Sequence, residues 1–313
     1  MKFKDSDFEI ITQDPGYVGG LKMIEKIGRT CYQSDDKITE NSYLDFVERM
    51  RKSKHYAMLE FFTVYLKLKN DKEEEIKFYT ENPYSKLVRK DDSVLVTTNY
   101  RVLVENSRES DLTYFCPSPE PEHPKRLTIK LFISRGISHE SVRHRVGSFA
   151  QSSQRYICYA KEKFGGEITY IIPSVIYKIR DRLSKTIDPL TKESREYLKN
   201  LTGEELVNQL ICLDRGVSTW YNVLEKIEND YKYLILEEDW KAQEARGILC
   251  NDTSTVLNIC MFTEDWKHYL DLRALGTTGA PHPDMKRISE KILDKLILDE
   301  VFTINDKGEL CLK

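Results

Sequence analysis

The amino-acid sequence predicts an α+β fold in which a mixed or antiparallel sheet is packed with helices. Segments with alternating or dense β-branched and aromatic residues stand mostly in the first half of the chain, and longer segments with helical spacing stand in the second. The chain has 313 residues, of which 40% are hydrophobic, enough for one large core. Without an internal repeat or a low-complexity linker, we expect residues 1–313 to form a single domain.

The strand pattern is strongest in four segments, which we expect to form one sheet. They are residues 63–68, 94–104, 126–133 and 168–173. Residues 70–125 are richer in charge and proline than their surroundings, and we interpret them as an insertion in the domain.

Helical spacing is clearest after residue 200. Thr202 and Glu205 form a capping-box pattern, and apolar residues follow at spacings of four and three as far as Ile227, which predicts one long helix. A second helix is expected over 237–246, ending at Gly247.

A third helix is expected to begin at Thr263. The acidic Glu264 and Asp265 follow, where the helix dipole favours negative charge. We expect this helix to run through Arg273 and to end at Gly276.

Composition excludes several classes of protein. Forty-eight basic and fifty-one acidic side chains give a formal charge of -3, so no global field attracts nucleic acid or an anionic membrane. The seven cysteines are scattered and contain no pair two residues apart, which argues against a disulfide framework or a zinc site. With no apolar run of membrane-spanning length, we expect a cytoplasmic protein that binds neither metal nor membrane.

Residues 135–156, RGISHESVRHRVGSFAQSSQRY, are unlike any other part of the chain. They combine cationic side chains with short polar ones: Arg135, Arg143, His144, Arg145 and Arg155 with Ser148, Gln151, Ser152 and Ser153. Arginine forks match phosphate oxygens, and serine hydroxyls and loop amides add donors. The segment follows the strand expected at 126–133 through an Arg-Gly turn and a short helix. It therefore predicts a site for a phosphorylated small molecule.

An isolated Arg-His-Arg more often faces water or pairs with acids. Here Ser153 stands at the eighth position after Arg145, and Arg155 follows two residues later. In this extended form, from Arg143 to Tyr156, the segment resembles the signature of the flavin-dependent thymidylate synthases.

Further segments resemble the same family in order and spacing. KHYAMLEFFTVYL contains His55 and Glu60, EARGIL contains Arg246, and WKHYLDLR contains His268 and Arg273. Against that family, residues 176–200 form a second insertion beside 70–125. Ala150 and Phe262 depart from the family pattern, which often has asparagine at these positions.

The resemblance implies two sets of binding residues. For the substrate dUMP they are Glu140, Arg143, Gln151, Ser152, Ser153, Gln154, Arg155, Arg246 and Arg273. For FAD they are Arg143, His144, Arg145, Gln151, His268, His55, Glu60 and Thr263. Arg273 is implied as the catalytic residue, because a cation at the uracil edge would stabilise the N3 anion and activate the ring.

The resemblance also implies the chemistry. A methyltransferase of this family converts dUMP to dTMP with methylenetetrahydrofolate as carbon donor and NADPH-reduced FAD as hydride source, without a catalytic cysteine. It implies a homotetramer whose active sites are shared between subunits.

Two alternatives remain open at this point. A non-catalytic nucleotide-binding or RNA-binding protein could also use an arginine and serine loop beside aromatic residues, although an RNA-binding protein should show a basic face. A family member that has lost its flavin is the second alternative.

Overall fold

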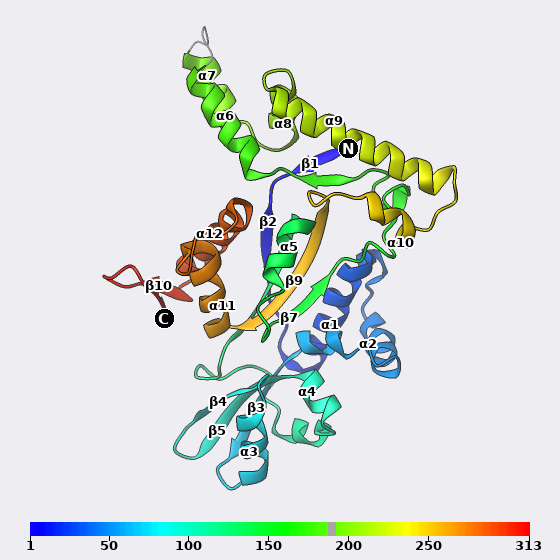
Figure 1. Ribbon diagram of the computed structural model, residues 1–313. Coiled ribbons are helices and arrows are strands. Elements are labelled where there is room, and N and C mark those ends of the chain that lie inside the picture. The colour runs from blue at the N-terminus through cyan, green and yellow to red at the C-terminus, as the bar shows by residue number, and fades with distance from the viewer. Residues whose placement is uncertain (187–191) are drawn as a thin grey trace.

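The computed structural model describes residues 1–186 and 192–313, and a four-stranded antiparallel sheet lies at its centre (Figure 1). The strand order is β2 (Asp7–Ile11), β6 (Arg126–Ser134), β9 (Ser254–Phe262) and β7 (Ser148–Gln151). Strands β6 and β9 pair along their whole lengths, so segments far apart in the sequence lie side by side.

Helices pack on both faces of this sheet. On one face lie α5 (Arg135–Ser141), α11 (Thr263–Leu270) and α12 (Pro283–Leu298), and on the other α1 (Gly16–Tyr32). Because alternate strand residues point to opposite faces, every second residue of β6 and β9 joins the first core. Its members include Ile129, Leu131, Ile133, Leu257, Ile259, Met261, Trp266, Tyr269, Ile288 and Ile292.

A second sheet follows the order β3 (Thr63–Lys69), β5 (Ser93–Asn99) and β4 (Lys86–Arg89). It is accompanied by α2 (Ser42–Lys52), α3 (Glu73–Glu81) and α4 (Tyr100–Glu105). Leu21 and Ile24 of α1 share a core with Val64 and Val96 of this sheet. The charge-rich region around 70–125 is therefore packed onto the N-terminal helices.

Two smaller sheets complete the structure. The parallel pair β1 (Lys2–Lys4) and β8 (Thr169–Ile171) adjoins α6 (Ser174–Thr186), α7 (Lys192–Asn200), α8 (Gly203–Ile211), α9 (Arg215–Leu236) and α10 (Ala242–Ala245). The last strands, β10 (Phe302–Ile304) and β11 (Leu310–Leu312), form an antiparallel pair.

The predicted α+β class is confirmed, and so are the strands at 63–68, 126–133 and 168–173. The prediction of one sheet is wrong, because the described strands form four. The strand expected over 94–104 is also wrong in its second half. It ends at Asn99, whose side chain accepts a hydrogen bond from the Val102 N–H at 3.2 Å and so begins α4.

The single helix predicted from Thr202 to Ile227 is wrong, because the chain breaks after Ile211. Asp214 begins α9, with Oδ1 accepting the Val217 N–H at 3.1 Å. Thr202 occupies the N-cap position of α8 but makes no side-chain cap bond. The predicted capping box is therefore not formed.

The prediction of a helix over 237–246 is also wrong. Only Ala242–Ala245 is α-helical, Asp239 has a φ of 53°, and Gly247 lies inside a 3₁₀ turn. By contrast, the helix at Thr263 is confirmed. It continues as a π-helical turn, Asp271–Leu275, and ends at Gly276, whose φ of 69° is left-handed.

The single-domain organisation and its two insertions stay predictions. Within the insertion expected at 176–200, residues 187–191 lie outside the described residues, and the rest contributes to α6 and α7. Across the described ranges, we find no helix of sufficient length and apolar character to cross a bilayer.

Candidate active site

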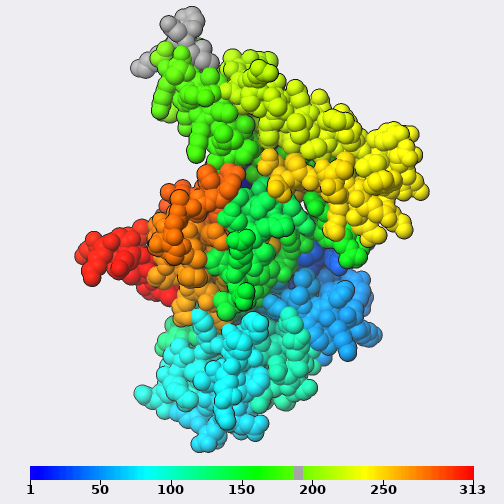
Figure 2. Space-filling view, viewed as in Figure 1, coloured from blue at the N-terminus to red at the C-terminus, as the bar shows by residue number. Residues whose placement is uncertain are grey.

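The signature segment crosses from β6 to β7 over the strand between them, β9. Ser134 Oγ accepts the Ile137 N–H at 3.4 Å, so Arg135 and Gly136 begin α5 and do not form the expected turn. In Figure 2 the green segment that contains α5 reaches the surface between the orange C-terminal helices and the blue N-terminal helices. The signature segment therefore lies on the central sheet, and part of it is exposed at the surface of the molecule.

Thr255 of β9 contacts both Arg135, at the start of the segment 135–156, and Gln151 and Ser152 near its end. Its hydroxyl lies 3.1 Å from Arg135 Nη1, 3.2 Å from Gln151 Nε2 and 3.0 Å from Ser152 Oγ. Ser152 Oγ also accepts the Val256 N–H at 3.1 Å. Thr255 is only 3% exposed, so this network fixes the start of the loop that follows β7.

The next residues of the loop are held by the helix on the other face. The Ser153 N–H donates to the Cys31 carbonyl at the end of α1, at 2.9 Å, and Ser153 Oγ accepts the Arg155 N–H at 3.3 Å. Gln151 Nε2 donates to Ser138 Oγ of α5 at 2.7 Å. The residues implied for dUMP from Gln151 to Arg155 therefore have a fixed backbone.

The Arg273 side chain donates two hydrogen bonds to Glu140, in the last turn of α5. Its Nη1 donates to Glu140 Oε2 at 3.1 Å, and its Nη2 donates to the Glu140 carbonyl at 3.0 Å. The π-helical turn Asp271–Leu275 brings this side chain to the signature. Glu140 also lines a cavity of about 480 Å³ that Lys178 and Asp252 share.

His144, the centre of Arg-His-Arg, lies between two residues of α11. Its ring centroid is 4.7 Å from that of Tyr269 and 5.9 Å from that of His268. Burial first, and then the neighbouring Arg273 and His268 side chains, lower the pKa of His144 to about 4, so the ring is neutral at pH 7. Its Nε2 is buried and has no hydrogen-bond partner among the described residues.

The remaining cations of the site are unpaired. Across the described ranges, no carboxylate lies within ion-pair distance of Arg143, Arg145, Arg155 or Arg246, and each of these residues is exposed. The Arg155 guanidinium lies over the Tyr156 ring, 5.5 Å from its centroid. Unpaired guanidinium groups leave charge available for an anionic ligand.

Three further residues implied for FAD lie outside the signature segment. Glu60 pairs with Arg101 at 2.6 Å, and the exposed His55 precedes the same 3₁₀ segment. Thr263 stands at the opposite end of β9 from Thr255, about 26 Å away at roughly 3.3 Å per residue. Arg126 connects Glu60 to the signature segment, because its Nη1 donates to the Glu60 carbonyl at 3.2 Å and its Nη2 donates to Ser148 Oγ at 3.3 Å.

Phe262, which departs from the family pattern, is buried just before Thr263. Its ring is 5% exposed and lies beneath two cations, with Lys86 Nζ at 4.8 Å and the Arg126 guanidinium at 5.6 Å from its centroid. The side chain is thus enclosed by protein, and Lys86 of β4 pairs with Glu264 and Asp265 beside it. The region around 70–125 reaches the start of α11 through this contact.

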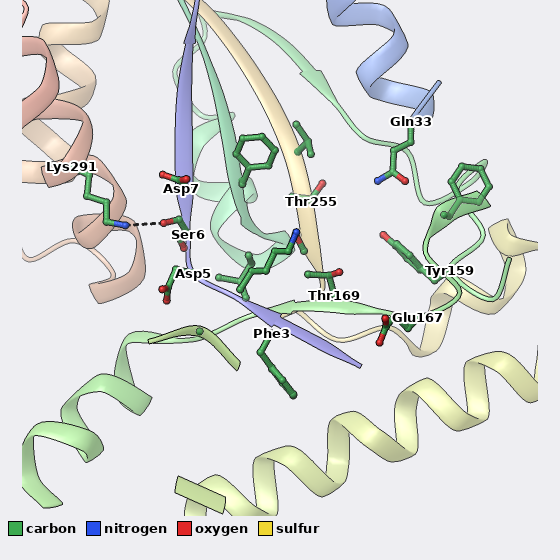
Figure 3. Close-up of a pocket in the computed structure, with 17 residues that line it drawn as sticks. Phe3, Asp5, Ser6, Asp7, Gln33, Tyr159, Glu167, Thr169, Thr255 and Lys291 are labelled. Atoms are coloured by element: carbon green, nitrogen blue, oxygen red, sulfur yellow. Dashed lines mark hydrogen bonds between the residues drawn. The ribbon is translucent and has the colours of Figure 1, made fainter. Parts of the chain in front are cut away.

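A larger pocket of about 760 Å³ borders the signature network (Figure 3). Thr255 and Tyr159 line it together with Gln33 and residues of β1, β2 and β8. The sequence did not single out Thr255, because the strand that carries it was not expected. The run STVLNICMF from 254 to 262 gave the only signal, as a short apolar run rich in β-branched residues.

The fold and the site together define an α+β protein with exposed, unpaired arginines beside its central sheet. The chain belongs to the thymidylate synthase complementing protein family, whose sequence model matches residues 121–298. The family expected from the signature is thereby confirmed.

Curated relatives match only part of the chain. A flavin-dependent thymidylate synthase from Corynebacterium glutamicum is 28% identical over 155 residues, covering 49% of this chain and 51% of that protein. One from Corynebacterium efficiens is 28% identical over 177 residues, covering 56% and 58%. The chain thus spans little more than half the length of these relatives.

Among solved structures, a UMP/dUMP methylase from Streptomyces cacaoi bound with 5-Br dUMP is similar at a TM-score of 0.42 and 13% identity. The match covers 95% of this chain and 93% of that one. At that TM-score the likeness assigns neither a ligand nor an activity to this chain.

Proposed function

We propose that the protein is a flavin-dependent thymidylate synthase that methylates dUMP to dTMP, with methylenetetrahydrofolate as carbon donor. The observation that supports this most directly is the contact of Arg273 with the last turn of α5, beside His144. Segments more than 120 residues apart in the sequence, both matching the family pattern, meet at one place. The cation Arg273 would suit the pyrimidine, and the neutral imidazole of His144 would suit the flavin.

The nucleotide would be held by the loop after β7. Ser152, Ser153, Gln154 and Arg155 offer hydroxyl, amide and guanidinium donors, and Arg246 adds a second cation. Phosphate binds best where several fixed donors converge. The fixed backbone of this loop supports such a role.

Arg273 would act on the uracil ring. Its guanidinium would face the N3 edge and stabilise negative charge there, which makes the ring more reactive toward the one-carbon unit. Burial raises the pKa of the thiol of Cys31, whose backbone carbonyl accepts the Ser153 N–H, to about 11. A thiolate nucleophile at that position is therefore disfavoured, which suits a mechanism without catalytic cysteine.

The residues present fit FAD. The orphaned Nε2 of His144 can accept or donate one hydrogen bond, and the unpaired Arg143 and Arg145 can meet the pyrophosphate. Gln151 and His268 would complete this side of the cofactor site. When bound, FAD reduced by NADPH supplies the hydride.

His55, Glu60 and Thr263 would meet the cofactor from another subunit. Thr263 stands six residues after Leu257, the partner of Gln151 in β9, and a homotetramer with shared sites would bring a neighbouring copy to this region. The exposed positions of Arg143 and Arg145 are consistent with closure of the site by a neighbouring copy.

The test is an absorbance spectrum of the purified protein between about 300 and 500 nm, followed by anaerobic addition of NADPH with and without dUMP. We expect a bound flavin whose reduction depends on dUMP, and dTMP formation when methylenetetrahydrofolate is added. A protein that neither takes up FAD nor binds dUMP would overturn the proposal.

Arg273→Lys tests the role of the arginine. It keeps the charge and removes the fork, so we expect dTMP formation to fall about 100- to 1000-fold while the flavin remains bound. Arg180→Lys is the matched control, because Arg180 bonds Leu201 and Asp181 away from the site. Equal losses in both variants would remove Arg273 from the chemistry.

A further inference from the structure

Arg126, the first residue of β6, joins two segments that carry residues implied for FAD. Its Nη1 donates to the Glu60 carbonyl at 3.2 Å, and its Nη2 donates to Ser148 Oγ at 3.3 Å. Nη1 also donates to Thr63 Oγ1 at 3.2 Å. Glu60 belongs to the 3₁₀ segment Tyr56–Phe61, and Ser148 begins β7. One guanidinium therefore bridges segments that are far apart in the sequence.

The Glu60 end of this bridge is fixed by two arginines. The Glu60 carbonyl lies at the end of its 3₁₀ segment, where a helical turn leaves acceptors without an internal partner. Arg126 supplies the donor, while the Glu60 carboxylate pairs with Arg101 at 2.6 Å. The segment is therefore a firm support for whatever Arg126 holds on its other side.

The Ser148 end of the bridge directly follows the Arg-His-Arg turn. The Gly147 N–H donates to the His144 carbonyl at 3.0 Å, which closes this turn one residue before β7. The place is crowded, because a Cβ atom on Gly147 would lie 2.9 Å from the Met261 side chain. Ser148 itself is only 3% exposed. Its bond to Arg126 therefore fixes the end of the turn that carries the cations expected to meet FAD.

The Arg126 guanidinium also covers the ring of Phe262, 5.6 Å from its centroid. A phenyl ring offers no hydrogen bond where the family pattern often has asparagine. The guanidinium brings a cation with N–H donors to the same place. Arg126 is in none of the motifs that carry the family resemblance, and only the structure brings it here.

We propose that Arg126 is a positioning residue for FAD, which holds the end of the Arg-His-Arg turn against the Glu60 segment. The inference rests on the proposed function, because it concerns the same cofactor. The competing explanation is that Arg126 only anchors the second sheet, whose strand β3 begins at Thr63. The first explanation assigns the effect to the bond with Ser148, and the second assigns it to the bond with Thr63.

The experiment measures the dissociation constant of FAD for the full chain by quenching of flavin fluorescence, and that of dUMP at saturating FAD. We expect Arg126→Met to bind FAD about 30-fold more weakly and dUMP with less than about a threefold change. The loop implied for dUMP keeps its own anchors, because Ser152 bonds Thr255 and Ser153 bonds Cys31. Arg126→Lys keeps the charge without the fork, so its FAD affinity should fall between the other two.

Ser148→Ala and Thr63→Val form a matched pair, because each removes one buried hydroxyl that accepts a bond from Arg126. Ser148→Ala should weaken FAD binding about threefold to tenfold, and Thr63→Val should change it less than about twofold. This pair decides between the two explanations even if Arg126→Met does not fold.

Equal losses of FAD affinity in Ser148→Ala and Thr63→Val, or a loss confined to Thr63→Val, would overturn the inference. An Arg126→Met variant that binds FAD as tightly as wild type would also overturn it. So would equal weakening of FAD and dUMP in that variant, because a general loss of structure affects both ligands alike. A wild-type protein that takes up no FAD would instead contradict the proposed function.

Discussion

The guanidinium of Arg273 is closed on Glu140, with Nη1 donating to Oε2 at 3.1 Å and Nη2 to the backbone carbonyl at 3.0 Å. Both side chains are mostly covered, at 18% and 26% exposed. A pyrimidine that hydrogen-bonds to both terminal nitrogens of Arg273 must displace at least the Glu140 carboxylate. Glu140 is therefore a competitor for the residue proposed to activate the substrate.

Glu140→Gln should strengthen the binding of dUMP. A partly exposed ion pair contributes about 0.2–1 kcal/mol, so removal of the competing charge should lower the dissociation constant by up to about fivefold. Titration calorimetry of the FAD-loaded protein measures it. Asp271→Asn is the control, because it breaks the Lys267–Asp271 pair on the same turn without touching Arg273. Weaker binding of dUMP to Glu140→Gln would mean that the carboxylate is itself a ligand.

His144 predicts a pH dependence of stability. Its pKa falls from an ordinary 6.5 to about 4 on folding, so the unfolded chain takes up the proton first as pH decreases. Stability is therefore lost as pH falls from about 6.5 to about 4. Allowing for solvent screening of a partly exposed ring, we expect a loss of about 1–2 kcal/mol.

Urea unfolding of wild type and His144→Gln across this pH window measures the effect. Carboxylates titrate in both proteins, so the difference between the two curves isolates the histidine. The wild type should lose stability relative to the variant as pH falls. Parallel curves would show that the ring is not held neutral by the fold.

The sequence predicted the arginine- and serine-rich segment, residues 143–155, better than the elements that surround it. Arg143 to Arg155 and the helix that begins at Thr263 could be recognised because residue type and spacing are local properties. The meeting of Arg273 with Glu140 could not, since it depends on a π-helical turn and on the packing of α11 against α5. Only the family resemblance placed the two residues in one pocket.

Other features were hidden for different physical reasons. Strand β9 is almost wholly buried, so it lacks the polar alternation that identifies an exposed strand. Its Thr255 therefore had no visible role. At Asn99, a side-chain cap overrides a run of β-branched residues that continues into α4. Tertiary packing and capping decided these cases, not local preference.

Thr255 should be among the most costly hydroxyls to remove. Thr255→Val removes the buried hydroxyl partner of Ser152 and one of two acceptors each for Arg135 Nη1 and Gln151 Nε2, and we expect a loss of about 1–3 kcal/mol in the free energy of unfolding. Thr97→Val is the matched control, because Thr97 is fully buried and its Oγ1 has no partner among the described residues. That variant should be neutral or slightly stabilising by urea unfolding. Equal costs at both positions would deny the Thr255 network a structural role.

The break between α8 and α9 gives the last prediction. Asp214 Oδ1 caps α9 through the Val217 N–H, and Oδ2 pairs with Arg182 at 2.7 Å. Asp214→Ala should therefore lower the free energy of unfolding by about 1 kcal/mol, the usual cost of losing an N-cap. Thr202→Ala should cost a few tenths or less, about the level of an exposed substitution, because Thr202 makes no side-chain cap bond. Arg182→Met removes only the ion pair and shows how much of the Asp214 effect belongs to the cap. If Thr202→Ala proved as costly as Asp214→Ala, residues 202–236 would behave as the single capped helix that the apolar spacing predicts, and the separate start at Asp214 would be wrong.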